Sequence, residues 1–123
     1  MADSEKLVFM VTHGPTEPEL ATIPFVMAGA ALASDVGVVM GFQGSAVELM
    51  RKGVAEGVAA DAFPPLGTLL ADARELGAQL LVCGPCLKSR GIDIATDLIE
   101  GAEVVAAARF IAEVTSATSS LVY

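Results

Sequence analysis

The chain has 123 residues, enough for one ordinary domain, and 54% of them are hydrophobic while only 18% are charged. Its formal net charge of −8 argues against binding to nucleic-acid phosphates, and its acidic first residues lack the basic start of a signal peptide. Two cysteines without an evident structural bridge suit a reducing compartment. We therefore expect a single domain over residues 1–123, located in the cytoplasm, whose apolar excess is covered in a homo-oligomer.

The first third of the chain predicts a strand, a helix and a second strand. Residues 7–11 form a continuous apolar run, which is typical of a strand covered on both faces. Thr16 and Glu19 have the spacing of a capping box, which predicts a helix from Thr16 to about Ser34. A second apolar run over residues 36–42 predicts a second buried strand.

The apolar stretch that contains this helix and strand also raises the question of a membrane span. Residues 20–47 carry one charge, Asp35, and Pro24 and several glycines interrupt them. A spanning helix needs about 20 continuous apolar residues. We interpret the stretch as a buried helix followed by a buried strand, and we expect no membrane association.

The middle third predicts two short helices separated by a loop. A second capping box begins at Ser45 and opens a helix that Gly53 ends. Residues 54–66 lack periodicity and predict a loop, after which Thr68 is the expected N-cap of a helix through Leu76. The apolar stripe of this helix consists of Leu69, Leu70, Ala73 and Leu76.

The last third alternates strands and helices. Strands are expected at residues 78–82, 103–106 and 121–123. Helices are expected after the cysteines up to Gly91, at residues 95–100 and at residues 107–114. Strands that alternate with helices over one domain predict an α/β fold, in which a mainly parallel sheet is covered on both faces.

Candidate functional residues lie in the loops that follow the strands. In open α/β sheets, ligands gather at the carboxyl ends of the strands. Three loops share this edge, at residues 12–16, 41–45 and 83–86, and they contain the sole histidine and both cysteines. His13 is a candidate base there, or it only forms a hydrogen bond within its turn.

Cys83 stands where the third apolar run stops and a helix begins. Pro85 suits the first turn of that helix, because its missing N–H would have no partner there. Free N–H groups and the helix dipole lead us to expect a lowered pKa and a reactive thiolate at Cys83, with Lys88 and Arg90 adding positive charge. In the alternative interpretation Cys83 and Cys86 are small buried hydrophobic residues, and Arg90 caps the helix or pairs with a nearby aspartate.

The segment Cys83-Gly84-Pro85-Cys86 matches the dithiol motif of thioredoxin letter for letter. Thioredoxin carries this motif early in the chain after a tryptophan and needs a later proline, whereas this chain has no tryptophan and no proline after Pro85. We exclude the thioredoxin fold and keep dithiol–disulfide exchange as an alternative chemistry. Two cysteines and one histidine fall short of a structural zinc set, so we expect no metal and no cofactor.

A second resemblance covers nearly the whole chain. The segments GFQGSAVELMRKGV, LADARELGAQLLVCGPCLKSRGI and DLIEGAEVVAAARFI resemble the DsrE/DsrF family, which includes the TusD subunit of the bacterial sulfur relay. In TusD-like members a cysteine ends the third strand and an Arg-Gly pair follows seven residues later, as Cys83 and Arg90-Gly91 do here. Cys86 has no counterpart in those members.

The resemblance implies a three-layer α/β/α fold with a sheet of about five strands, a homotrimer or homohexamer, and sulfur transfer between protein cysteines. It gives Cys83 the persulfide-carrying role, which would make the chain a sulfurtransferase-like carrier with a protein donor and a protein acceptor. Cys86 is then an auxiliary or resolving thiol, and Arg90 or Lys88 stabilises the anionic outer sulfur. Two other functions stay open: a thiol–disulfide oxidoreductase that uses Cys83 and Cys86, and a non-enzymatic oligomeric binding module.

Overall fold

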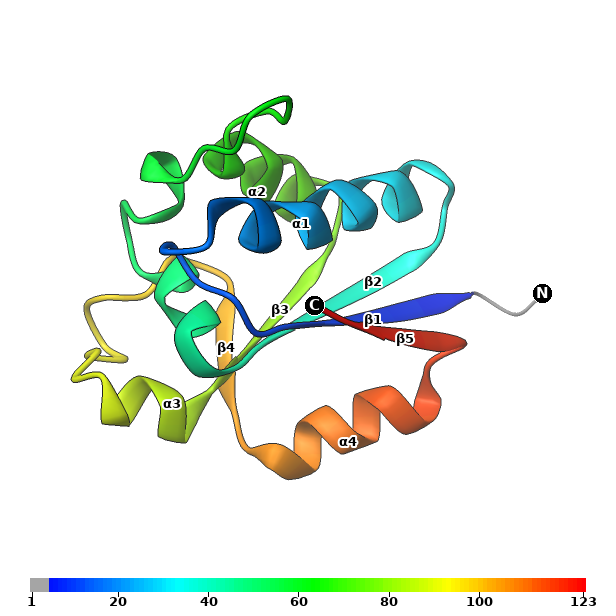
Figure 1. Ribbon diagram of the computed structural model, residues 1–123. Coiled ribbons are helices and arrows are strands. Elements are labelled where there is room, and N and C mark those ends of the chain that lie inside the picture. The colour runs from blue at the N-terminus through cyan, green and yellow to red at the C-terminus, as the bar shows by residue number, and fades with distance from the viewer. Residues whose placement is uncertain (1–4) are drawn as a thin grey trace.

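The computed structural model describes residues 5–123 as a five-stranded sheet with helices on both faces (Figure 1). The strands are β1 (Lys6–Val11), β2 (Gly37–Phe42), β3 (Gln79–Cys83), β4 (Ala102–Val105) and β5 (Ser119–Val122). They lie in the order β4-β3-β2-β1-β5, and each neighbouring pair is parallel. The predicted α/β fold with a parallel sheet of about five strands is confirmed, and the carboxyl ends of all five strands meet at one edge.

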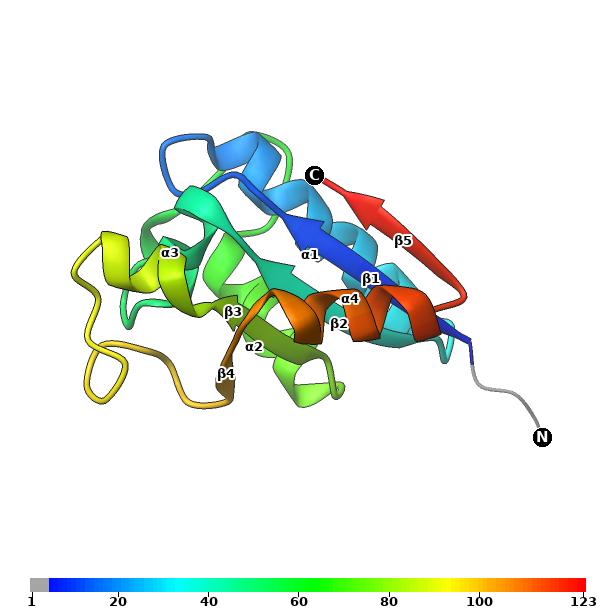
Figure 2. The same ribbon diagram turned by 90° about the horizontal axis from the view of Figure 1, so that it is seen from below.

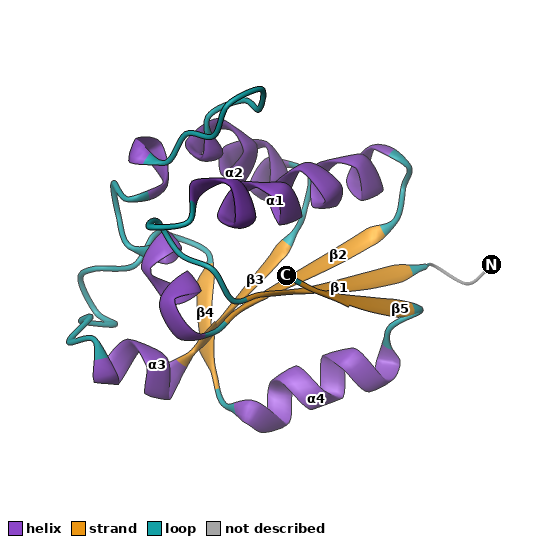
Figure 3. Cartoon of the chain, viewed as in Figure 1, coloured by secondary structure: helices purple, strands orange, loops and turns teal. Residues whose placement is uncertain are grey.

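The helices form the two outer layers. They are α1 (Pro18–Ala33), α2 (Leu66–Glu75), α3 (Gly84–Ser89) and α4 (Ala107–Ser116), together with 3-10 helices at Gly44–Met50 and Ala55–Gly57. Figure 3 shows α1 and α2 on one face of the sheet and α4 on the other, and Figure 2 shows α3 beyond the end of β3. Residues 20–47 thus form a helix and then a strand, as predicted. Within residues 5–123, every helix is too short or too polar to cross a bilayer.

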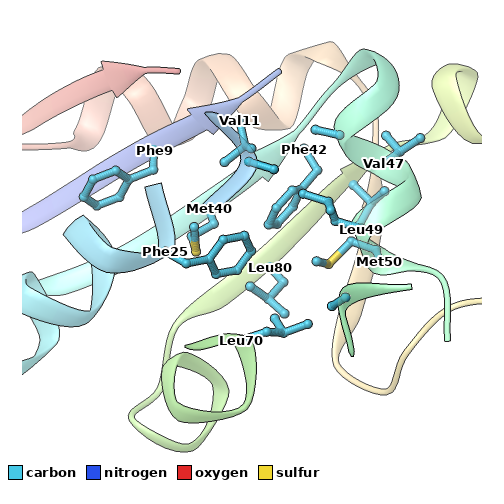
Figure 4. Close-up of a cluster of buried hydrophobic side chains, with 14 of the residues drawn as sticks. Phe9, Val11, Phe25, Met40, Phe42, Val47, Leu49, Met50, Leu70 and Leu80 are labelled. Atoms are coloured by element: carbon cyan, nitrogen blue, oxygen red, sulfur yellow. The ribbon is translucent and has the colours of Figure 1, made fainter. Parts of the chain in front are cut away.

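Two clusters of buried side chains hold these layers together. Side chains alternate between the two faces along each strand. The larger cluster packs against α1 and α2 and includes Phe9, Phe25, Met40, Phe42 and Leu80 (Figure 4). The smaller cluster packs against α4 and consists of Val8, Met10, Val39, Leu81 and Phe110. Strands buried on both faces account for the continuous apolar runs in the sequence.

The structure corrects the predicted helix caps. The N-caps are Glu17, Gln43 and Pro65 rather than Thr16, Ser45 and Thr68, and no side chain makes a capping hydrogen bond at these three positions. Pro18 at the first position of α1 and Pro65 at the N-cap of α2 suit the starts of these helices, although α1 also contains Pro24 in its interior. The Ser45 hydroxyl instead donates to the carbonyl of Thr12, at 3.5 Å.

Two further predictions are wrong. Residues 95–100, predicted as a helix, form turns, and Leu98 pairs with Arg51 in an isolated antiparallel bridge. The carboxylates of Asp93 and Asp97 accept backbone N–H bonds within this segment, and such local bonds compete with helix formation. Leu76, predicted in the apolar stripe, follows the last residue of α2 and is 58% exposed.

Candidate functional site

Both cysteines lie at the junction of β3 and α3. Cys83 is the last residue of β3 and the N-cap of α3, and Cys86 follows in the first turn of that helix. Both are free thiols and both are half-buried. A Cβ atom on Gly84 would lie 3.3 Å from a methyl carbon of Val104, so the start of α3 packs closely against β4. Both side chains also pack against the larger hydrophobic cluster.

The sulfur of Cys86 is held by the loop that follows β2. The backbone N–H of Gly44 donates a hydrogen bond to Cys86 Sγ, at 3.3 Å. Gly44 has a φ of 57°, a left-handed conformation that glycine adopts without steric cost. Because β2 is the direct neighbour of β3, its loop reaches the thiols across one strand spacing. The sequence alone does not indicate this contact of Gly44, since the strand order must be known before the loops after β2 and β3 can be placed side by side.

Arg90 closes the far end of α3. Its Nη1 donates to the carbonyl oxygen of Cys86, at 3.2 Å, and the Ser89 hydroxyl donates to the same oxygen, at 3.1 Å. Among residues 5–123, Arg90 forms no ion pair with an aspartate, so of the two alternative roles the capping role is the one observed. Its positive charge nevertheless acts on the Cys83 thiol.

The expected lowering of the Cys83 pKa is wrong. Burial raises the pKa of the Cys83 thiol, and the side chain of Cys86 raises it further. The backbone N–H of Cys86 and the charge of Arg90 lower it, but the net direction is upward. The backbone of the six-residue helix α3 favours the thiolate, but burial outweighs it.

The other two predicted site residues, His13 and Lys88, form no hydrogen bond to either sulfur within residues 5–123. The Nδ1 atom of His13 lies 3.4 Å from the hydroxyl of Thr12, and within residues 5–123 His13 has no hydrogen bond to either cysteine. Strand β2 separates β1, which precedes His13, from β3. The loop after β1 does contact the loop after β2, because a Cβ atom on Gly14 would overlap the carbonyl oxygen of Ser45.

Lys88 lines an open depression of about 790 Å³ beside α3. The depression is mostly apolar, and its lining consists of Gly84, Pro85, Lys88, Ile92, Asp93, Ile94 and Ala95. Gly84 and Pro85 lie between the two cysteines in sequence, but neither cysteine lines the depression. Elsewhere among the described residues, no three His, Cys, Asp or Glu side chains come together as a metal site.

Comparisons with known proteins agree with this fold. The model of the DsrE/DsrF-like family matches residues 5–123. The ychN protein from E. coli superimposes with a TM-score of 0.81 at 19% identity, over 97% of this chain and 99% of that one. MTH1491 from Methanobacterium thermoautotrophicum, a protein of unknown function, superimposes with a TM-score of 0.76 at 15% identity, over 98% of this chain and 100% of that one.

Two uncharacterized proteins of Methanocaldococcus jannaschii are similar in sequence. MJ0760 is 31% identical over 107 residues, which cover 87% of this chain and 38% of that protein. MJ0989 is 58% identical over 36 residues, which cover 29% of this chain and 31% of that protein. The matched regions thus span only about a third of the length of these curated relatives.

Proposed function

The chain belongs to the DsrE/DsrF-like family, a membership that supports a sulfur-relay type of role, and we propose that it carries persulfide sulfur on Cys83. The observation that carries the proposal is the position of Cys83. It is a free, half-buried thiol at the carboxyl end of a central strand, where parallel α/β sheets bind their ligands. A positive side chain, Arg90, acts on it from the same short helix.

The proposed transfer is a pair of displacements at sulfur. The Cys83 thiolate attacks the outer sulfur of a donor persulfide, the donor's S–S bond breaks, and the donor leaves as a thiolate with the electron pair of that bond. An acceptor thiolate then attacks the outer sulfur now held on Cys83, and the Cys83 thiolate leaves. One sulfur atom moves through the site without net oxidation or reduction.

The surroundings of Cys83 act differently on the empty carrier and on the sulfur-loaded carrier. Because burial raises the pKa of the Cys83 thiol, the empty carrier rests mainly as the neutral thiol near neutral pH. The loaded form differs, because the outer sulfur of a persulfide is anionic near neutral pH. The positive charge of Arg90, which already opposes the upward shift of the Cys83 pKa, favours that anion.

The donor and the acceptor are proposed to be cytoplasmic proteins with reactive cysteines, and the chain is proposed to work as a homotrimer or homohexamer. Exposed apolar side chains on two outer helices support an assembly. Leu20 and Met27 of α1 are 41% and 44% exposed, and Ile111 of α4 is 62% exposed. Burial of such side chains between subunits removes apolar surface from water.

The test is a loading experiment followed by intact-mass measurement. The chain is incubated with a small-molecule persulfide and separated from the excess. The Cys86→Ser variant gains the mass of one sulfur atom, and the wild-type chain does so when its mass is taken immediately after loading, whereas Cys83→Ser gains none at any time. Equal loading of Cys83→Ser and wild type overturns the proposal.

One observation favours a second candidate, a thiol–disulfide oxidoreductase: the side chain of Cys86 acts on the Cys83 thiol, so the two thiols are neighbours. That function requires both cysteines for a single redox cycle. It predicts equal loss of disulfide-exchange activity in Cys83→Ser and in Cys86→Ser. A sulfur carrier keeps its loading in Cys86→Ser, which distinguishes the two functions.

A further inference from the structure

We propose that Cys86 is a resolving thiol, which attacks a persulfide on Cys83, releases sulfide and leaves a Cys83–Cys86 disulfide. This inference rests on the proposed function, because it needs sulfur to arrive on Cys83. It adds a second outcome for that sulfur: reduction and release as hydrogen sulfide, instead of transfer to an acceptor.

The position of the two residues on α3 favours this attack. The side chain of an N-cap residue lies over the first turn, near the backbone N–H of the third helical residue. Here the N-cap is Cys83 and that third residue is Cys86. The Cys83 side chain makes no capping hydrogen bond, but the backbone N–H and the side chain of Cys86 both act on its thiol, so the two residues are neighbours.

The sulfur of Cys86 is also positioned from outside its own helix. The hydrogen bond from the Gly44 N–H, at 3.3 Å, connects it to the loop after β2. The carbonyl of Cys86 accepts bonds from Ser89 and Arg90, which hold its backbone in α3. A cysteine that only fills space needs none of these contacts, whereas a nucleophile that must meet a neighbouring sulfur benefits from a fixed position.

The step is balanced in atoms and electrons. The Cys86 sulfur bonds to the inner sulfur, Cys83 Sγ, while the bond between Cys83 Sγ and the outer sulfur breaks. The outer sulfur leaves with that electron pair and takes the proton of the Cys86 thiol, so that hydrosulfide is released. The outer sulfur is reduced by two electrons, and the two cysteine sulfurs supply one each. A dithiol reductant then restores both thiols for another cycle.

The test follows the loaded chain after the excess donor has been removed and before any reductant is added. The wild type is expected to lose the extra sulfur, release one hydrosulfide per chain and end at a mass lower than the starting chain by two hydrogen atoms. Cys86→Ser keeps an acceptor for the Gly44 N–H but lacks the nucleophile, so it is expected to retain the persulfide. Cys86→Ala provides a second variant without the thiol.

Ser34→Ala is the matched control, because it removes a serine-to-carbonyl hydrogen bond of the same kind at the end of α1 and leaves α3 and both thiols in place. It is expected to release hydrosulfide as the wild type does. Equal retention of the persulfide by wild type and Cys86→Ser, with no disulfide in the wild type, overturns this inference while the carrier function stands. Failure of Cys83 to accept sulfur in any variant overturns both.

Discussion

The carboxyl end of β3, which holds the thiols, and the sheet face covered by α4 differ in the kind of polar contact that their side chains make. On the α4 face, charged side chains pair with one another: Lys6 with Glu113 at 3.0 Å, and Arg109 with Glu103 and Glu113, both at 2.8 Å. At the thiol end, the one hydrogen bond to a sulfur among the described residues comes from a backbone N–H, that of Gly44.

The difference indicates which region is built for stability and which for chemistry. Charges that satisfy one another fasten α4 to the sheet and are not free to react. The thiols form no ion pair among the described residues, and the pKa of Cys83 is set by burial, by Cys86 and by the charge of Arg90. Substitutions on the α4 face should therefore change stability, and substitutions at the thiol end should change sulfur loading.

The largest effect is expected from Cys83→Ser, which should abolish sulfur loading while it changes stability little. Sulfur loading should disappear, because no other thiol occupies the end of β3, whereas the free energy of unfolding should change by about 1 kcal/mol or less for a half-buried side chain. The two quantities are measured by intact mass after persulfide treatment and by urea unfolding. Unchanged loading, or loss of loading only because the chain unfolds, contradicts the contrast.

The next largest effect is expected at Gly41, in β2 on the α4 side. A Cβ atom there would lie 2.7 Å from Phe110 Cε1 and 2.8 Å from Met10 Sδ, and both of these side chains are buried. Gly41→Ala should cost about 1–3 kcal/mol through overpacking, measured by urea unfolding, while the folded fraction still loads sulfur.

Gly29→Ala is the matched control for this substitution. A Cβ atom on Gly29 in α1 meets nothing within 4 Å, and alanine is the better helix former. We expect this variant to be as stable as the wild type or more stable by about 0.5–1 kcal/mol. A loss of stability equal to that of Gly41→Ala shows that steric contact at Phe110 is not the cause.

A smaller effect, which depends on pH, is expected at Glu113. Hydrogen bonds from Arg109, followed by those from Lys6, lower the pKa of this carboxyl in the folded chain. Its contribution to stability is therefore complete above the ordinary glutamate pKa and is lost as pH falls through the lowered value. Glu113→Gln should cost about 0.5–1 kcal/mol at neutral pH and less in strong acid, measured by urea unfolding across pH. A cost that does not depend on pH argues against ionic stabilisation of α4.

The smallest effect is expected at Arg90. Its charge lowers the pKa of Cys83, so Arg90→Gln should raise that pKa and slow the alkylation of Cys83 near neutral pH. An exposed charge contributes about 0.2–1 kcal/mol, which corresponds to about a 1.4- to 5-fold change in rate. Lys88→Gln is the control, because Lys88 is not among the groups that shift this pKa. Equal slowing in both variants means that net charge, rather than the position of Arg90, is responsible.

The positions of the strands were predictable because a strand that is buried on both faces has apolar residues at successive positions. Residues 7–11 and 36–42 contain no polar side chain, and residues 78–82 contain only Gln79. These runs correspond to β1, β2 and β3 within one or two residues. The helix starts were less predictable, since the prolines at positions 18 and 65 override the capping patterns beside them.

The site was predictable only in part. Cys83, Cys86 and Arg90 are close in sequence, so the two turns of one short helix hold all three. The Gly44 contact depends on β2 being the neighbour of β3, which no local pattern specifies. The direction of the Cys83 pKa shift depends on how much water the packed chain removes from the thiol. The sequence indicates the helix start beside Cys83 but not the extent of its burial.

The central claim is that the outer sulfur rests on Cys83, and peptide mapping of the loaded chain tests it most directly. After persulfide treatment and alkylation of Cys86→Ser, the extra sulfur should lie on Cys83, and the same mapping of Cys83→Ser should find Cys86 without it. Extra sulfur on Cys86 in the Cys83→Ser variant, at the level that Cys83 reaches in Cys86→Ser, contradicts the account.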